Sequence, residues 1–256
     1  HSFPTRRSSD LANNNWRSVT YGNGTYVAVA KTGSGNRVMT SYDGITWSTQ
    51  APPNDNDWQA ITYSNGLFVA VSTSGTGNRV MTSPDGVTWT IRTSAADNSW
   101  YAITYGAGTF VAVSNSGTGS DVMTSPDGIT WTLRTSTTTN QWQGITYGNG
   151  LFVATAISGT NRVMTSPDGI TWTARTSAAE SNTWISVTYA NGLFVAVAGT
   201  GSGNRVMTSP DGITWTGRTS AADNDWYSVT YGAGTFVAVA SSGTGNRIMR
   251  STDGIT

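Results

Sequence analysis

Six short segments carry the residues that could do acid chemistry, each a version of TSPDGITWT with one aspartate and one glycine. A glycosidase needs two carboxyl groups roughly 5 to 10 Å apart. Each segment supplies only one, and equivalent positions of a repeated structure lie apart around it. We therefore predict no catalytic residue among these aspartates. They are Asp43, Asp85, Asp127, Asp168, Asp211 and Asp253.

Metal and cofactor chemistry find little support in the same residues. The chain has no cysteine, a single histidine (His1) and one carboxylate per segment, too few ligands for a structural or catalytic ion. We predict no metal site and no cofactor. Glu180 is the only glutamate and lies in the loop SAAESNTW, which we interpret as a solvated loop position.

The elements that hold these segments form a repeat. Its leading tryptophans recur every 42 residues, at Trp16, Trp58, Trp100, Trp142, Trp184 and Trp226. Such a period suits propeller blades or helical repeats. Segments such as ITYGNGLFVAVS alternate over short stretches rich in β-branched and aromatic residues and are broken by glycines, which excludes long helices.

Each copy offers four strands, which in the second copy are 58–63, 67–72, 79–83 and 87–92. A single four-stranded sheet cannot bury both faces, so the units must pack against one another around an axis. We predict an all-β fold, a β-propeller of six four-stranded antiparallel blades over residues 12–256 with an incomplete last blade. The expected blades are 16–57, 58–99, 100–141, 142–183, 184–225 and 226–256.

The aspartate segments fall between the third and fourth strands, where a turn is expected. Serine and aspartate bond back to nearby N–H groups, and glycine takes the left-handed conformation. The tryptophan that ends the segment then packs on the sheet and removes roughly 150 to 250 Å² from water. These structural tryptophans are Trp47, Trp89, Trp131, Trp172 and Trp215.

This pattern resembles the Asp-box, or bacterial neuraminidase repeat, propellers, whose turn reads S-x-D-x-G-x-T-W. The matching residues in the second copy are Ser83, Asp85, Gly86, Thr88 and Trp89, with one residue fewer between Asp and Thr in every copy. The resemblance implies a propeller and a structural turn remote from any active site. It leaves activity open, because the family includes sialidases, other glycosidases, sorting receptors and photosynthetic assembly factors.

The charge balance argues against some classes of partner, and the two chain ends do not match the repeat. Lys plus Arg and Asp plus Glu are 14 each, so no basic field attracts nucleic acid or anionic lipid, and no apolar stretch reaches the ~20 residues of a membrane span. Residues 1–11, HSFPTRRSSDL, resemble a translated sequencing adapter, and we exclude them as a non-native segment. The last copy, STDGIT, stops before its tryptophan, so we expect a fragment of a larger gene product.

The copies differ mainly in two loops, one before each leading tryptophan and one after FVAV, and antiparallel strands place both on one face. A ring of Arg, Asn and Tyr on that face, with glycine-rich loops between, could offer several equivalent shallow pockets to sugars or acidic groups, and such weak sites gain affinity by acting together. Equally, these arginines could be solvated loop ends or bond to carbonyls of neighbouring blades. The candidate residues are Arg37, Arg79, Arg162, Arg205, Arg247, Tyr101, Tyr227, Gln59 and Gln143, with Arg17 and Ile185 at equivalent positions.

These observations favour a non-catalytic, monomeric binding or display propeller that meets glycans or surface proteins outside the cell or at its surface. The single lysine and the Ser/Thr/Gly/Asn-rich loops motivate the extracellular location. Two alternatives remain open: a sialidase-like glycoside hydrolase, and an architectural repeat of a larger surface or tail protein. A sialidase-like site would need several different residues contributed by different blades, whereas these copies are nearly identical.

Overall fold

Short alternating segments broken by glycine turns form every regular element of the protein. The computed structural model describes residues 13–116 and 118–256, and these form strands joined by turns and loops. No helix within these ranges is long and apolar enough to cross a membrane. Segment 1–11, which we interpret as adapter-derived, lies outside the described residues.

The strands group into six sheets in chain order. The first three sheets hold β1 (Trp16–Gly22), β2 (Thr25–Ala30), β3 (Val38–Ser41), β4 (Ser48–Gln50), β5 (Trp58–Ser64), β6 (Leu67–Ser72), β7 (Val80–Ser83), β8 (Thr90–Arg92), β9 (Trp100–Gly106), β10 (Thr109–Ser114), β11 (Val122–Ser125) and β12 (Thr132–Arg134). The last three hold β13 (Trp142–Gly148), β14 (Leu151–Ala156), β15 (Val163–Ser166), β16 (Thr173–Arg175), β17 (Trp184–Ala190), β18 (Leu193–Ala198), β19 (Val206–Ser209), β20 (Thr216–Arg218), β21 (Trp226–Gly232), β22 (Thr235–Ala240) and β23 (Ile248–Ser251).

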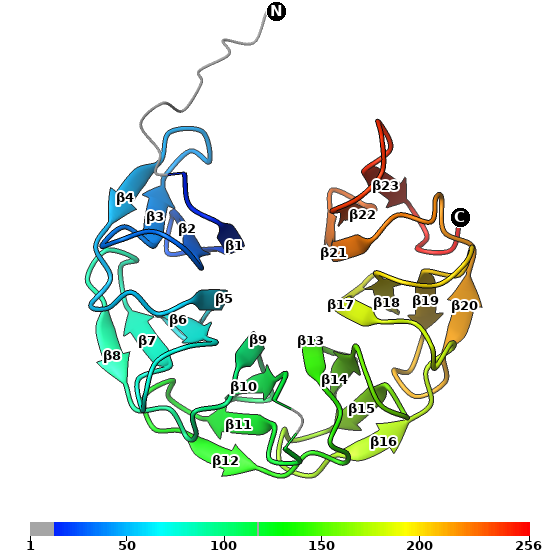
Figure 1. Cartoon of the computed structure of the whole chain (residues 1–256), viewed down its shortest axis with the longest axis horizontal. Coiled ribbons are helices and arrows are strands. Elements are labelled where there is room, and N and C mark those ends of the chain that lie inside the picture. The colour runs from blue at the N-terminus through cyan, green and yellow to red at the C-terminus, as the bar shows by residue number, and fades with distance from the viewer. Residues whose placement is uncertain (1–12, 117) are drawn as a thin grey trace, which may run out of the picture.

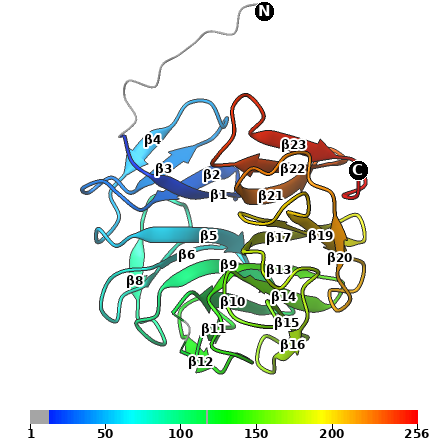
Figure 2. The ribbon, with the colours of Figure 1, turned by 45° about the vertical axis from the view of Figure 1, so that its right-hand side comes forward.

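Each sheet is an antiparallel meander, and the six sheets stand side by side around an axis (Figure 1). The first strand of every sheet lies nearest the axis and the last lies at the rim. Figure 2 shows the same sheets in an oblique view, turned by 45° about the vertical axis. Five sheets have four strands, and the sixth has three, β21, β22 and β23. The predicted six-bladed propeller with an incomplete last blade is confirmed, and we call the sheets blades 1 to 6.

Three of the predicted strand boundaries in blade 2 are wrong by small amounts. The third strand begins at Val80 and the first ends at Ser64, a shift of one residue each. The fourth strand begins at Thr90, three residues later than predicted. The reason is that residues 87–89 belong to the turn, where the N–H groups of Val87 and Thr88 bond to Asp85 instead of to a neighbouring strand.

The first hairpin of each blade has the tight turn that its sequence predicts. In blade 2, Asn65 and Gly66 both have positive φ, 52° and 77°, and join the pair Ser64 and Leu67. Two consecutive left-handed residues match the right-handed twist of the flanking strands. The same geometry recurs in the other blades, so the inner hairpin is a constant unit of the repeat.

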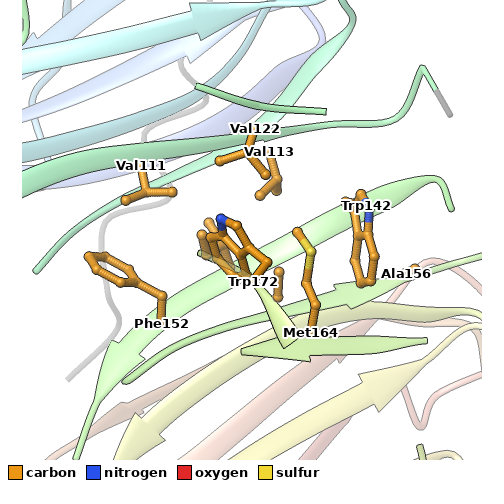
Figure 3. Close-up of a cluster of buried hydrophobic side chains, with 10 residues drawn as sticks. Val111, Val113, Val122, Trp142, Phe152, Ala156, Met164 and Trp172 are labelled. Atoms are coloured by element: carbon orange, nitrogen blue, oxygen red, sulfur yellow. The ribbon is translucent and has the colours of Figure 1, made fainter. Parts of the chain in front are cut away.

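The hydrophobic core is divided among the spaces between adjacent blades. Figure 3 shows the cluster between blades 3 and 4, where Val111, Val113 and Val122 meet side chains of blade 4 such as Trp142 and Trp172. Equivalent clusters join blades 1 and 2, 2 and 3, 4 and 5, and 5 and 6. Each cluster therefore stabilises two blades at once, and no blade has a core of its own.

Blades 1 and 6 each show one face without such packing. On blade 1, Val19 is 59% exposed, whereas its equivalent Ile61 in blade 2 is 6% exposed. On blade 6, Val239 and Ile248 are 44% and 70% exposed, while Val197 and Val206 in blade 5 are 0% and 7% exposed. The two blades stand apart in Figure 1, so the ring formed by residues 13–116 and 118–256 is open between them.

This arrangement predicts unequal effects for one substitution made at equivalent positions. Trp142→Ala should lower the free energy of unfolding by about 3 to 5 kcal/mol, because it leaves a cavity between two blades. Trp142 is 0% exposed. Trp16→Ala is the matched control, since Trp16 lies half-buried on the open side, and should cost less than half as much. Urea denaturation followed by circular dichroism measures both; equal losses would contradict packing between blades as the main stabilising term.

Candidate functional site

The aspartate turns are hydrogen-bonded units. In blade 2, Asp85 Oδ1 accepts from the N–H groups of Val87 and Thr88 at 2.8 and 2.7 Å and from Ser83 Oγ at 2.8 Å. Ser83 Oγ in turn accepts from Gly86 N at 2.8 Å, and Trp89 Nε1 donates to the Gly86 carbonyl at 2.9 Å. The Ser83 hydroxyl, the Asp85 carboxylate and the Trp89 indole N–H therefore all form hydrogen bonds within one tight turn. The sequence predicts a turn at this place.

The electrostatics of these turns disfavour proton transfer. Bonds from backbone N–H groups stabilise the charged carboxylate and lower the pKa of Asp85 from 3.8 to about 2. The pKa of Asp43 is lowered to about 2 in the same way, mainly by the N–H groups of Thr46 and Ile45. A general acid needs a pKa near the working pH, so these carboxylates do not suit that role.

The opposite face carries the variable loops, and a repeated asparagine ties them together. Asn56 Nδ2, two residues before the leading tryptophan of blade 2, donates to the carbonyl of Asn78 at 2.8 Å. Asn78 lies in the loop between β6 and β7, so this bond joins the two loops. The pattern N-x-W occurs in all six copies, a constant signal within segments that otherwise vary. The equivalent donors are Asn14, Asn98, Asn140, Asn182 and Asn224.

The candidate arginines of these loops bond locally. Arg79 Nε and Nη1 donate to the carbonyls of Gly75 and Thr73 at 2.8 and 2.9 Å, and the side chain is 14% exposed. Asp97 from the next loop lies 3.6 Å from Arg79 Nε. Arg37 and Arg205 make the same type of contact, so these three arginines brace the loop between the second and third strands.

The equivalent loop positions in blades 3, 4 and 6 make different contacts. Arg162 donates to the carbonyl of Asn182 at 2.7 Å, which is a bond to the loop that leads into the next blade. Arg247 donates to Gly243 and is exposed. In blade 3 the arginine is replaced by Asp121, a fully buried carboxylate that accepts from Ser114 Oγ and Gly119 N, both at 2.7 Å. Bracing the loop therefore does not depend on one residue type.

Glu180 has a local structural role. Its Oε1 accepts from the N–H and the hydroxyl of Ser177 at 2.6 and 2.8 Å, which closes the loop before Trp184. The prediction of a solvated position is wrong, because the residue is partly buried and its Oε2 is buried without a hydrogen-bond partner among the described residues. It does not line the axial pocket described next. No group of three or more Asp, Glu, His or Cys side chains within the described ranges could hold a metal ion.

A pocket of about 190 Å³ lies on the axis, lined by the first strands of all six blades. Each blade contributes the residue that follows its leading tryptophan. In blade 2 the pairing of β5 with β6 shifts between Trp58 and Ala60, so that Gln59 is the extra residue of a β-bulge. Bulges redirect side chains. The equivalent bulged residues are Arg17, Tyr101, Gln143, Ile185 and Tyr227.

The chemistry of this ring is polar and carries one positive charge. Arg17 Nη1 donates to Tyr227 Oη at 3.3 Å across the open side of the ring. Arg17 Nε is buried and has no hydrogen-bond partner within the described part of the chain. The lining contains no Asp, Glu or His side chain. The pocket thus offers amide, hydroxyl and guanidinium groups to a ligand, and its lining holds no carboxylate.

The structure therefore separates the predicted residues into two sets. Gln59, Tyr101, Gln143 and Tyr227 meet around the axis, together with Arg17 and Ile185. The five arginines each bond within or beside their own loop, and their ligand role stays a prediction. The sequence analysis did not identify the buried Nε donor of Arg17. It also missed the hydrogen bond by which the asparagine of each N-x-W pattern joins two loops, although this pattern is present in all six copies.

Comparison with known proteins defines the fold and no more. No protein-family model and no curated protein matches the sequence. Virginiamycin B lyase from Staphylococcus aureus is similar in structure, with a TM-score of 0.76 and 13% identity over 94% of this chain and 85% of that chain. YCF48 from Cyanidioschyzon merolae gives 0.66 and 15% over 93% and 82%, and a gluconolactonase from Xanthomonas campestris gives 0.62 and 10% over 89% and 83%.

These neighbours place the chain in the class of β-propellers, as its six blades require. Their functions differ from one another, so the fold leaves the function of this chain to be argued from its own residues. The resemblance to the Asp-box repeat rests on the turn residues alone.

The aspartate turns predict a definite acid sensitivity. The folded-state pKa of Asp85 lies below its usual value, so the stability it contributes is present above about pH 4 and is lost as pH falls toward 2. Asp85→Ala should lower the free energy of unfolding at pH 7 by the order of 1 kcal/mol, because the turn is open to solvent. The variant should also lose part of the decline between pH 4 and 2. Urea titrations at several pH values test this, and a parallel decline in both proteins would contradict it.

Substitution of the loop arginines tests whether they stabilise their loops or serve to bind a ligand. Arg79→Ala should lower the free energy of unfolding by about 1 to 2 kcal/mol, because it removes two bonds to loop carbonyls. Arg247→Ala is the matched control and should cost less, since that exposed side chain makes a single bond, to Gly243. Thermal and urea denaturation measure both. Unchanged stability in Arg79→Ala would favour the alternative in which this arginine serves a ligand.

Proposed function

We propose that this protein is a non-catalytic binding propeller that holds a polar ligand in its axial pocket, with carbohydrate as the favoured class. The observation that carries the proposal is the convergence of six bulged residues, one from each blade, on a single pocket. A bulge at this position turns each side chain out of the sheet pairing and toward the axis. Five of the six bulged residues carry polar groups, which supports recognition of a ligand rich in hydroxyl or anionic groups.

The individual groups suit a sugar. Gln59 and Gln143 each supply an amide that both donates and accepts, which matches vicinal hydroxyl groups. Tyr101 and Tyr227 add hydroxyl groups and flat apolar rings. Arg17 has a buried Nε donor with no partner among the described residues, and a ligand oxygen could satisfy it. An acidic sugar would gain most, because a charged hydrogen bond is stronger than a neutral one.

The same pocket argues against a hydrolase. Glycoside hydrolysis uses a pair of carboxyl groups, and the pocket lining contains none. Glu180, the only glutamate, bonds to Ser177 in a loop. Asp121, the one fully buried carboxylate among the described residues, is engaged with Ser114 and Gly119. The sialidase alternative therefore lacks a supporting constellation.

A protein segment is a second candidate ligand. One structural neighbour, YCF48, has been solved bound to D1 peptide, at 16% identity to this chain and a TM-score of 0.64. A propeller of this shape can thus present a surface for a peptide. The chain has a single lysine, and on this ground we propose that the protein acts at the cell surface or outside the cell. It would serve there either as a receptor for glycans or as a display module.

The test is a glycan array followed by calorimetry with the best sugar, N-acetylneuraminic acid included. Arg17→Ala and Tyr101→Ala should each weaken binding by about tenfold, the effect expected for a lost charged or buried hydrogen bond. Tyr42→Ala is the control, because Tyr42 is 80% exposed in the aspartate turn of the opposite face. Its affinity should match that of the wild type.

Two results would overturn the proposal. Absence of binding to any glycan at about millimolar concentration would reject the carbohydrate ligand. Turnover of a fluorogenic sialoside that Glu180→Gln abolished would restore the hydrolase alternative. Binding that survived both pocket substitutions would move the site away from the axis.

A further inference from the structure

The inner strand of each blade has an edge that faces the axis. In blade 3, β9 pairs only with β10 among the described residues, and the first strands of all blades lie nearest the axis (Figure 1). Hydrogen-bonded and non-hydrogen-bonded pairs alternate along two antiparallel strands. A two-residue hairpin turn is closed by a hydrogen-bonded pair, here Gly106 and Thr109. Ile103 therefore falls in a non-hydrogen-bonded pair, and its N–H group points toward the axis.

The same register recurs in the other blades, and in two places the preceding blade supplies an acceptor. Ile61 N of blade 2 donates to Ser18 Oγ of blade 1 at 3.3 Å. Val229 N of blade 6 donates to Ser186 Oγ of blade 5 at 3.2 Å. Both bonds show the N–H group turned away from its paired strand and toward the neighbouring blade.

Blades 2, 3 and 4 have no hydroxyl at the position of these serines. The residues there are Ala60, Ala102 and Gly144. A hydroxyl acceptor is therefore missing for one N–H group on each following blade, those of Ile103, Ile145 and Val187. Within residues 13–116 and 118–256, none of these N–H groups donates to a side chain or to a loop carbonyl.

These N–H groups belong to buried residues beside the axial pocket. Ile103, Ile145 and Val187 are 9%, 8% and 7% exposed, and the last two line the pocket. Gly144 lies in the same wall, and a Cβ atom there would stand 2.9 Å from the carbonyl oxygen of Ile185. The glycine thus keeps this part of the wall free of side chains. A buried N–H without a partner costs free energy, so an acceptor is expected here.

We propose that the N–H groups of Ile103, Ile145 and Val187 bind a carboxylate of the ligand in the axial pocket, which makes that ligand a uronic acid or another carboxylated sugar. The inference rests on the proposed function and names the ligand class of the same pocket. Convergent backbone N–H groups form anion sites, because each contributes a partial positive charge. A carboxylate has two acceptor oxygens that neighbouring N–H groups can share. The carbonyl groups of the same residues face the same way and suit the hydroxyl groups of a sugar.

Matched sugars test the proposal by calorimetry. They are the methyl glycosides of glucuronic acid and glucose, and those of galacturonic acid and galactose. Each pair differs only by a carboxylate in place of a hydroxymethyl group. At least one acid should bind about five- to tenfold more tightly than its neutral partner, the gain expected from charged hydrogen bonds. Binding of the neutral sugars with equal affinity for both acids would overturn this inference and leave the proposed function standing.

A double variant, Ala60→Ser with Ala102→Ser, introduces the hydroxyl of the other blades where it can accept from the N–H groups of Ile103 and Ile145. It should lose the preference for the acid and keep its affinity for the neutral sugar. Ala107→Ser is the matched control, because Ala107 is exposed in a hairpin turn of the opposite face. Circular dichroism verifies that both variants fold. A preference that survives in the double variant contradicts the proposed site.

Amide NMR of protein with isotope-labelled isoleucine observes the site directly. Glucuronate should shift the amide signals of Ile103 and Ile145 more than that of Ile61, because Ser18 already accepts from the Ile61 N–H. Acetate probes the anion site apart from any sugar. If acetate and both uronates leave the signals of Ile103 and Ile145 unshifted, the inference is overturned. If acetate shifts them and no sugar binds, the carboxylate site is supported and the carbohydrate proposal fails.

Discussion

A four-stranded sheet with two apolar faces can only be stable between two other sheets, and this constraint governs the whole molecule. Each blade lacks a core until a neighbour supplies valines to one side and tryptophans to the other, as in the cluster around Trp142. The blades therefore stabilise one another in sequence. The faces that lack a neighbour, at Val19 and Ile248, show what each blade would expose by itself.

Uniform packing between blades leaves few places where a distinct function can reside. The aspartate turns and inner hairpins repeat with the same bonds in blade after blade, so one face of the propeller is constant. The loop face is held by the asparagine donors, which permits the residues between them to vary. At the axis, a bulge in each first strand presents one side chain that no packing constraint specifies. The axis is therefore the place where we propose that recognition occurs.

Departures from the repeat are the most informative residues for function. Asp121 replaces an arginine and still braces its loop, which shows that this position tolerates exchange. Arg250 in blade 6 stands where each of the other blades has a threonine. In the axial ring, Arg17 and Ile185 stand where other blades have Gln or Tyr. Such differences make the pocket asymmetric.

The sequence alone determined the repeat period, the strand order, the inner hairpins and the turn character of the aspartate segments, because these depend on contacts between residues close in the chain. Asn-Gly at Asn65 and Ser-x-Asp at Ser83 dictate local backbone geometry wherever they occur. Only the tertiary structure showed that Gln59 and Tyr227 meet at one pocket and that Arg79 is largely buried against loop carbonyls. The position of these side chains depends on where the bulge falls and on how six blades pack around an axis. The sequence of a single repeat determines neither.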